Sequence, residues 1–214
     1  MPAKKARDRL IRWAASHPEW ALGFEDETWG SRVAQPARQA WTPAPQPLRV
    51  VEQTVPPPAP APTALAGYGL LLQERAPQGV SQAHVWLRFV AERPVRAVTV
   101  VFLTWGCAKV TALGKTALRL VWDKAAWPRS HAVRQWLRAH HQQVKREGQG
   151  LGIVRCPLPS KSPWLTPWAA HGVHGKRAVV EPTRLLTAAE LMERGTAHCG
   201  CPYEDPLSIP QEVS

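Results

Sequence analysis

Two isolated aspartates, Asp26 and Asp123, are the residues of this chain whose type and position could do chemistry. Each follows an apolar, strand-like run, over 21–25 and 117–122 respectively. Carboxylates projecting from neighbouring strands can share divalent cations, and Mg²⁺ prefers such hard oxygen ligands. An acid at the end of a strand can also cap a turn or pair with a local base, and that alternative stays open here. We predict that Asp26 and Asp123 bind metal.

The overall charge favours a polyanionic partner. The chain has 214 residues, with 27 Lys and Arg against 16 Asp and Glu, a net charge of +11 and a pI near 10.2. This balance is typical of proteins that bind nucleic acid. The length and 44% hydrophobic content suffice for one sizeable core, or one core with an appendage. No apolar run reaches the roughly 20 residues of a membrane-spanning helix. We therefore expect a cytoplasmic protein, nucleoid-associated when bound to DNA, with reduced thiols at its cysteines.

Hydrophobic periodicity predicts an α/β fold, a mixed sheet with helices on its faces. Ser130 is a candidate cap for one helix, and 187–190 has the pattern of a capping box for the last. Proline dominates 36–63, which favours an extended loop. The predicted strands are 21–26, 66–74, 84–90, 117–122 and 152–156, and the predicted helices are 4–16, Pro94 to Gly114, 130–146 and one from Thr187.

Four segments, in order along the chain, resemble motifs of bacterial insertion-sequence transposases with a three-carboxylate (DDE-type) site, in the mariner-like superfamily. Residues 23–29 resemble the first-aspartate motif and 120–130 the second. Residues 158–167 resemble the run that leads into the third acid, and 173–178 also fit the family. The resemblance implies an RNase H-like domain, with a mixed sheet flanked by helices. Such a domain cleaves and transfers DNA strands with two Mg²⁺ or Mn²⁺ ions.

The resemblance assigns Asp26 and Asp123 to the first two catalytic positions. Glu25 and Glu27 flank the first of these and are less favoured as ligands. The third position departs from the family, where the pattern ends in glutamate, because 165–169 here reads Leu-Thr-Pro-Trp-Ala. The acid is replaced by Ala169, so the resemblance predicts a copy that is inactive or badly impaired.

Further departures lie beside the second aspartate. Lys124 stands where the family usually has asparagine, and Pro128 where it usually has histidine. A lysine next to the metal pair should weaken cation binding. Glu181 or His171 could supply the missing ligand, although imidazole suits Mg²⁺ poorly.

The resemblance also predicts the domain organisation. We expect 1–20 to be a remnant of the linker to a missing DNA-binding region, 21–182 the RNase H-like catalytic domain with its loop at 36–63, and 183–214 a C-terminal helix and tail. Only about twenty residues precede Asp26, so a helix-turn-helix region is expected to be missing, as in a truncated copy or a separately encoded half. Non-specific attraction to phosphates could remain. The candidate residues are Arg134, Arg138, Lys145, Arg146, Lys176 and Arg177.

Other functional hypotheses remain. One is a non-catalytic remnant of a transposase that binds DNA or forms a homodimer. Another is a metal-independent nuclease built on His140 and His141, or on His171 and His174, although adjacent residues of a helix face different directions. The cluster at 198–201, His-Cys-Gly-Cys, resembles half of a zinc site and lacks the second ligand pair of structural zinc sites.

Overall fold

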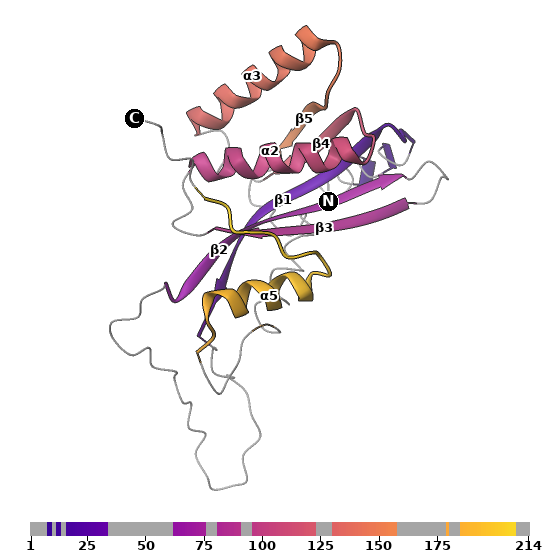
Figure 1. The fold of residues 1–214 in the computed structure, drawn as a ribbon. Coiled ribbons are helices and arrows are strands. Elements are labelled where there is room, and N and C mark those ends of the chain that lie inside the picture. The colour runs from indigo at the N-terminus through magenta and orange to yellow at the C-terminus, as the bar shows by residue number, and fades with distance from the viewer. Residues whose placement is uncertain are drawn as a thin grey trace, which may run out of the picture.

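The computed structural model describes residues 8–9, 12–13, 16–33, 62–75, 81–90, 96–122, 130–157, 179 and 185–208. Its architecture is a five-stranded sheet with helices on both faces (Figure 1). The elements are β1 (Trp20–Ser31), β2 (Ala64–Arg75), β3 (Ser81–Phe89), α2 (Arg96–Ala112), β4 (Ala117–Trp122), α3 (His131–Glu147), β5 (Gly152–Pro157) and α5 (Ala188–His198).

The sheet is mixed, as predicted. Its strand order is β3-β2-β1-β4-β5, with antiparallel pairing on the β3 and β2 side of β1 and parallel pairing on the β4 and β5 side. Strands β1, β2 and β3 follow one another in the chain and form the antiparallel half. Helices α2 and α3 supply the crossovers that the parallel strands require. Strand β1 is therefore central, with β2 on one side and β4 on the other.

The two faces of the sheet are covered by different helices (Figure 1). Alternation along β1 sends Ala21 to the core cluster beneath α2 and α3, and Leu22 and Phe24 to the cluster beneath α5. Strand β4 alternates in the same way, with Leu120 in the first cluster and Val121 in the second. Both faces of the central strands are thus buried, which explains their nearly continuous apolar runs.

The predicted end of the first strand is wrong. Strand β1 continues to Ser31, because β2 pairs with it without interruption from Ala21↔Glu74 to Ser31↔Ala64. The sequence after Phe24 is polar and lacks the apolar pattern of a strand, but its backbone still pairs with β2. Asp26 therefore lies inside a strand and not at its end.

Local capping signals in the sequence are confirmed. Ser130 is the N-cap of α3 and accepts a hydrogen bond from the Val133 amide, and Gly148 ends this helix in the left-handed conformation at φ 65°. Thr187 and Glu190 form a reciprocal capping box at α5, with distances of 2.8 and 3.1 Å.

Other predictions fall on residues outside the described ranges, namely 36–61 of the proline-rich loop and the start of a helix at Pro94. Residues 8–9 and 12–13 of the predicted N-terminal helix are helical. No helix within the described ranges is long and apolar enough to cross a membrane. All four cysteines are free thiols.

Candidate functional site

Asp26 lies on the central strand, opposite Gly69 of β2. Its side chain is half-buried, and Oδ1 accepts a hydrogen bond from the backbone amide of Glu27 at 2.9 Å. By alternation it shares its face with Phe24, on the side of the sheet that α5 covers. One candidate metal ligand therefore lies on the central strand of the sheet.

The pairing between β1 and β4 bears on the second aspartate. Every recorded pair, from Trp20↔Ala117 to Phe24↔Val121, joins residues 97 positions apart. Asp26 and Asp123 are separated by the same 97 positions in the sequence. Strand β4 is described as far as Trp122, the residue that precedes Asp123.

The remaining predicted site residues lie outside the described ranges. They are Asp123, Ala169, Lys176 and Arg177, together with the departures Lys124 and Pro128 and the alternatives His171, His174 and Glu181. The described residues contain no group of three or more His, Cys, Asp or Glu side chains that could hold a metal ion. They supply one member of the predicted metal pair, Asp26.

Glu25 points to the opposite face from Asp26 and is buried, with 1% of its surface exposed. Neither carboxyl oxygen has a hydrogen-bond partner in the described part of the chain. Burial raises the pKa of Glu25 well above its ordinary value of 4.5, and the negative charges of Glu27 and Asp26 raise it further. The pKa of Glu25 is therefore shifted toward the uncharged form, and its side chain does not share the face of Asp26.

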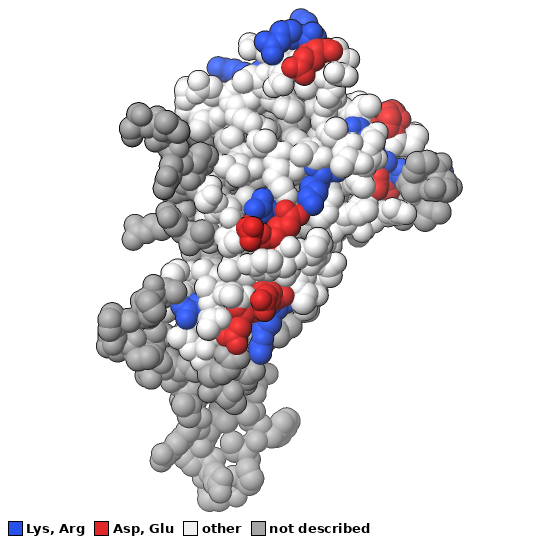
Figure 2. Space-filling view, in the orientation of Figure 1, with Lys and Arg blue, Asp and Glu red and all other residues white. Residues whose placement is uncertain are grey.

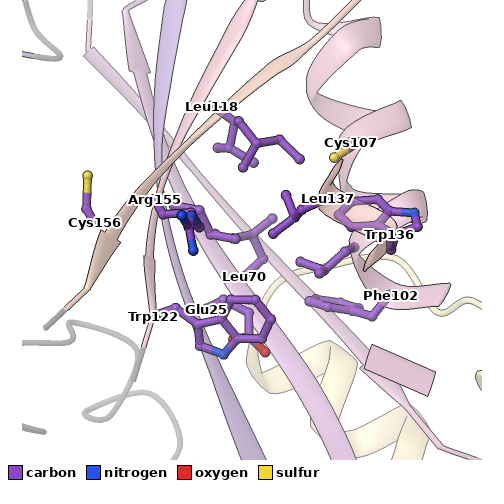
Figure 3. A pocket seen from close by; sticks show the side chains of 14 residues that line it. Glu25, Leu70, Phe102, Cys107, Leu118, Trp122, Trp136, Leu137, Arg155 and Cys156 are labelled. Carbon is purple, nitrogen blue, oxygen red and sulfur yellow. The ribbon is translucent and has the colours of Figure 1, made fainter. Parts of the chain in front are cut away.

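A cavity lies between the sheet and helices α2 and α3, and Glu25 lines it (Figure 3). Its empty volume is about 580 Å³, including the part open to solvent. Aromatic and aliphatic side chains form most of the lining. Sequence analysis missed this site, although strand alternation places Glu25 on the same face as Ala21, in the core. The principal lining residues besides Glu25 are Phe102, Trp122, Trp136, Leu137 and Arg155.

The first candidates for DNA binding lie on α3. Arg134, Arg138 and Lys145 follow each other at helical spacing on one exposed stripe, and Arg146 is also exposed. The helix holds one acid, Glu147, which pairs with Arg146 at 3.7 Å. Figure 2 shows a face on which blue and red side chains are interspersed, so this face is not uniformly basic. The basic stripe of α3, defined as Arg134, Arg138 and Lys145, is therefore a local feature.

The adjacent histidines of α3, His140 and His141, both contact backbone carbonyl groups. His140 Nε2 lies 2.7 Å from the Leu151 carbonyl, and the ring stacks on Trp136. His141 Nε2 lies 3.0 Å from the Ile153 carbonyl of β5. These contacts hold α3 against the sheet edge, which favours a packing role over a nucleolytic one.

A buried ion pair at the far end of the β1–β2 hairpin was also missed by sequence analysis. Lys115 Nζ contacts Glu74 Oε2 at 2.5 Å and donates to the carbonyls of Pro18 and Arg75. His84 Nε2 lies 2.7 Å from the other oxygen of Glu74. Burial alone raises the pKa of Glu74, but the hydrogen bonds and charges of Lys115 and His84 outweigh it and lower the pKa.

The thiols of the 198–201 cluster are protonated. Burial raises the pKa of Cys199 to about 11, and the neighbouring Cys201 contributes in the same direction. Burial also raises the pKa of Cys201. Zinc binds thiolates, so its binding here would require both thiols to lose a proton.

Comparison with known proteins identifies the fold. No family model matches the chain, and no curated protein matches it either. Two solved structures with a TM-score of 0.50 are the Mos1 strand transfer complex, at 13% identity over 89% of this chain, and the Mos1 mariner paired end complex with Mn, at 14% over 92%. The pre-cleavage Mos1 transpososome also matches, with TM-score 0.50, 12% identity and 89% coverage.

The chain spans about half the length of these structures, covering 50%, 57% and 52% of them in the order given. Similarity at this level of identity establishes the fold. The protein has the RNase H-like α/β fold of the Mos1 mariner transposase, a mixed five-stranded sheet with helices on both faces.

Proposed function

We propose that the chain is the catalytic domain of a DDE-type transposase of an insertion sequence, impaired in DNA strand cleavage and transfer because Ala169 occupies the third carboxylate position. The observation that carries the proposal is the constant offset of 97 between paired residues of β1 and β4. The same offset separates Asp26 from Asp123. If the same offset continued for two more residues, Asp26 and Asp123 would lie side by side on one face of the sheet.

The chemistry of this pair suits Mg²⁺ or Mn²⁺. Carboxylate oxygens are the ligands that these ions prefer, and one of the matched Mos1 structures is a complex with Mn. When bound, two such ions stabilise the attacking and leaving oxygens of a phosphoryl displacement. Asp26 would hold one side of the metal site from the central strand, and Asp123 would hold the other. Replacement of the third acid by Ala169 removes a metal ligand, which would weaken the stabilisation of both the attacking and the leaving oxygen.

DNA is the proposed partner. Two of the matched structures are a strand transfer complex and a pre-cleavage transpososome of Mos1. The net charge of +11 also supports a polyanionic ligand. The basic stripe of α3 supplies exposed charges that could contact phosphates without reading sequence. Lys176 and Arg177 would add to it.

Nicking of supercoiled plasmid in Mn²⁺ tests the catalytic part. The native chain, Ala169→Glu and the double variant Ala169→Glu/Asp26→Ala are compared, with Glu27→Gln in the Ala169→Glu background as the matched acid control. We expect the native chain to nick slowly or not at all, and Ala169→Glu to nick faster by on the order of 10²-fold. Asp26→Ala should abolish that gain and Glu27→Gln should keep it. Nicking that survives Asp26→Ala would contradict the proposed metal pair.

A second candidate function, a non-catalytic DNA-binding remnant, is favoured specifically by Ala169. It predicts salt-sensitive DNA binding by the native chain and no nicking by either the native chain or Ala169→Glu. Replacing Arg134, Arg138 and Lys145 by alanine should lower the slope of log K against log[salt] by about 3, because each lost phosphate contact removes roughly 0.9. Lys109→Ala on α2, whose charge is paired with Glu204 at 2.7 Å, is the matched control and should leave the slope unchanged.

A further inference from the structure

We propose that Arg88, Trp105 and Lys109 form a binding site for a phosphate group of the DNA backbone, and that Glu204 of the same chain occupies this site and competes with DNA. The three residues, called here the oxyanion site, lie on β3 and α2. The proposal rests on DNA as the partner proposed above, and it adds a site that does not belong to the basic stripe of α3.

Two donors of α2 converge on the carboxylate of Glu204. Trp105 Nε1 donates to Oε2 at 2.7 Å, and Lys109 Nζ contacts Oε1 at 2.7 Å. Trp105 and Lys109 are four residues apart in the helix, so their side chains lie on one face of it. Each carboxylate oxygen is therefore bound by a group from which a phosphate oxygen could also accept a hydrogen bond.

Arg88 of β3 brings a second positive charge to the site. Its guanidinium carbon lies 5.2 Å from the centre of the Trp105 ring, and Lys109 Nζ lies 5.6 Å from the same centre. Arg88 donates to the carbonyl of Asp205, and its buried Nε has no hydrogen-bond partner in the described part of the chain. The indole ring thus holds two cations close together, and one of them keeps a donor unused.

The oxyanion site stabilises a negative charge. Burial raises the pKa of Glu204, but hydrogen bonds from Lys109 and Trp105 and the charges of Lys109 and Arg88 outweigh burial and lower the pKa. Asp205, which is exposed, is the other acid of this segment. A backbone phosphate is likewise an anion with two oxygens free to accept hydrogen bonds, so it matches the group that the site already binds.

Glu204 belongs to the segment after α5, which runs back past β3 toward α2 (Figure 1). Leu207 anchors this segment, because it is 1% exposed and its amide donates to the Phe89 carbonyl at 2.7 Å. The side chains of Glu204 and Lys109 remain 26% and 40% exposed. Removing the carboxylate should therefore open the oxyanion site to solvent without releasing the segment.

DNA binding by the native chain, Glu204→Ala and Glu204→Gln tests the proposal. Glu204→Gln is the matched control, because it removes the same charge while its amide oxygen still accepts from Trp105 or Lys109. We expect Glu204→Ala to bind a short DNA duplex about tenfold more tightly than the native chain, and to steepen log K against log[salt] by about 0.9 for one further phosphate. Glu204→Gln should gain less than about threefold. Equal gains in the two variants, or no gain in Glu204→Ala, would overturn the proposal.

Lys109→Ala locates the gain. In the Glu204→Ala background it should remove the gain, whereas in the native background it should change little, because Glu204 already pairs with Lys109. A gain that survives Lys109→Ala would place the extra phosphate contact elsewhere and overturn the proposal. A thermal melt checks that Glu204→Ala is folded, and Glu204→Ser, which also empties the site, takes its place if it is not.

Two results separate this inference from the function proposed above. Absence of DNA binding by every variant would overturn both, whereas binding through the basic stripe of α3 without a gain in Glu204→Ala would overturn the oxyanion site alone. The source of the phosphate is tested by adding inorganic phosphate at constant ionic strength. Loss of the gain at a phosphate concentration on the order of 1 mM would assign the site to the free ion and overturn DNA as its ligand.

Discussion

Glu25 and Glu74 are two buried carboxyl groups of one sheet, and their pKa values are shifted in opposite directions. Glu25 lies on β1 beneath α2 and α3 with no hydrogen-bond partner in the described ranges, and its pKa is raised. Glu74 lies at the end of β2, 8% exposed, and is held by Lys115 and His84, which lower its pKa. Burial is common to both, so the partners decide the direction in which the pKa is shifted. Glu74 forms a buried ion pair with Lys115, whereas Glu25 has no hydrogen-bond partner among the described residues and lines a cavity.

Breaking the Glu74 site should have the largest effect on stability. Lys115→Met removes a buried cation and leaves Glu74 with His84 alone, and we expect the free energy of unfolding to fall by about 3 kcal/mol. Urea denaturation measures this change. The double variant Lys115→Met/Glu74→Gln should recover part of the loss, because it no longer buries an unpaired charge. A loss below about 1 kcal/mol would mean that the pair contributes like a surface ion pair.

Replacing Glu25 should change the free energy of unfolding in the opposite direction. Glu25→Leu removes an unsatisfied carboxyl group from an apolar environment, and we expect the free energy of unfolding to rise by about 1–2 kcal/mol at pH 7. Glu27→Gln, the neighbouring acid on an exposed position of β1, should change it by less than about 0.5 kcal/mol. Destabilisation by Glu25→Leu would show that this carboxyl group has a partner that stabilises it.

The pH dependence should separate the two acids. The folded-state pKa of Glu25 is raised, so its contribution is fully present below the unfolded pKa near 4.5 and is lost as the pH rises through the folded value. The advantage of Glu25→Leu over the native chain should therefore grow with pH above 4.5, by at most about 1.4 kcal/mol per unit.

Glu74 should show the reverse. Its folded-state pKa is lowered, so its contribution is present above 4.5 and is lost as the pH falls through the folded value. Thermal melts of the native chain, Glu25→Leu and Glu74→Gln between pH 3 and pH 8, on the order of one unit apart, check both signs. A difference between Glu25→Leu and the native chain that does not change with pH would contradict a raised pKa at Glu25.

Removing the second partner of Glu74 should have the smallest effect. His84→Ala deletes one hydrogen bond at 2.7 Å but leaves Lys115 in place, and we expect a loss of about 1 kcal/mol, measured by urea denaturation. A loss equal to that of Lys115→Met would show that the two partners act as one unit, as a double-mutant cycle can test.

The sequence predicted those elements whose signals are local. Strand β4 has its predicted bounds, Ser130 caps α3, and Thr187 with Glu190 caps α5. The end of β1 was wrong because its polar second half is held by backbone pairing with β2, which leaves no pattern in the side chains. Of the predicted metal pair, Asp26 is placed on the central strand; the position of Asp123 and the consequence of Ala169 stay predictions.

The sequence by itself determined the mixed α/β fold, because apolar periodicity and capping residues act over a few positions. Only the tertiary structure decided the direction in which the pKa of each buried carboxyl group is shifted. Glu74 meets Lys115 across the fold, and Glu25 meets a cavity formed by two helices that come much later in the chain. Such contacts depend on the packing of distant elements, and burial by those elements is the largest cause of the raised pKa of Glu25.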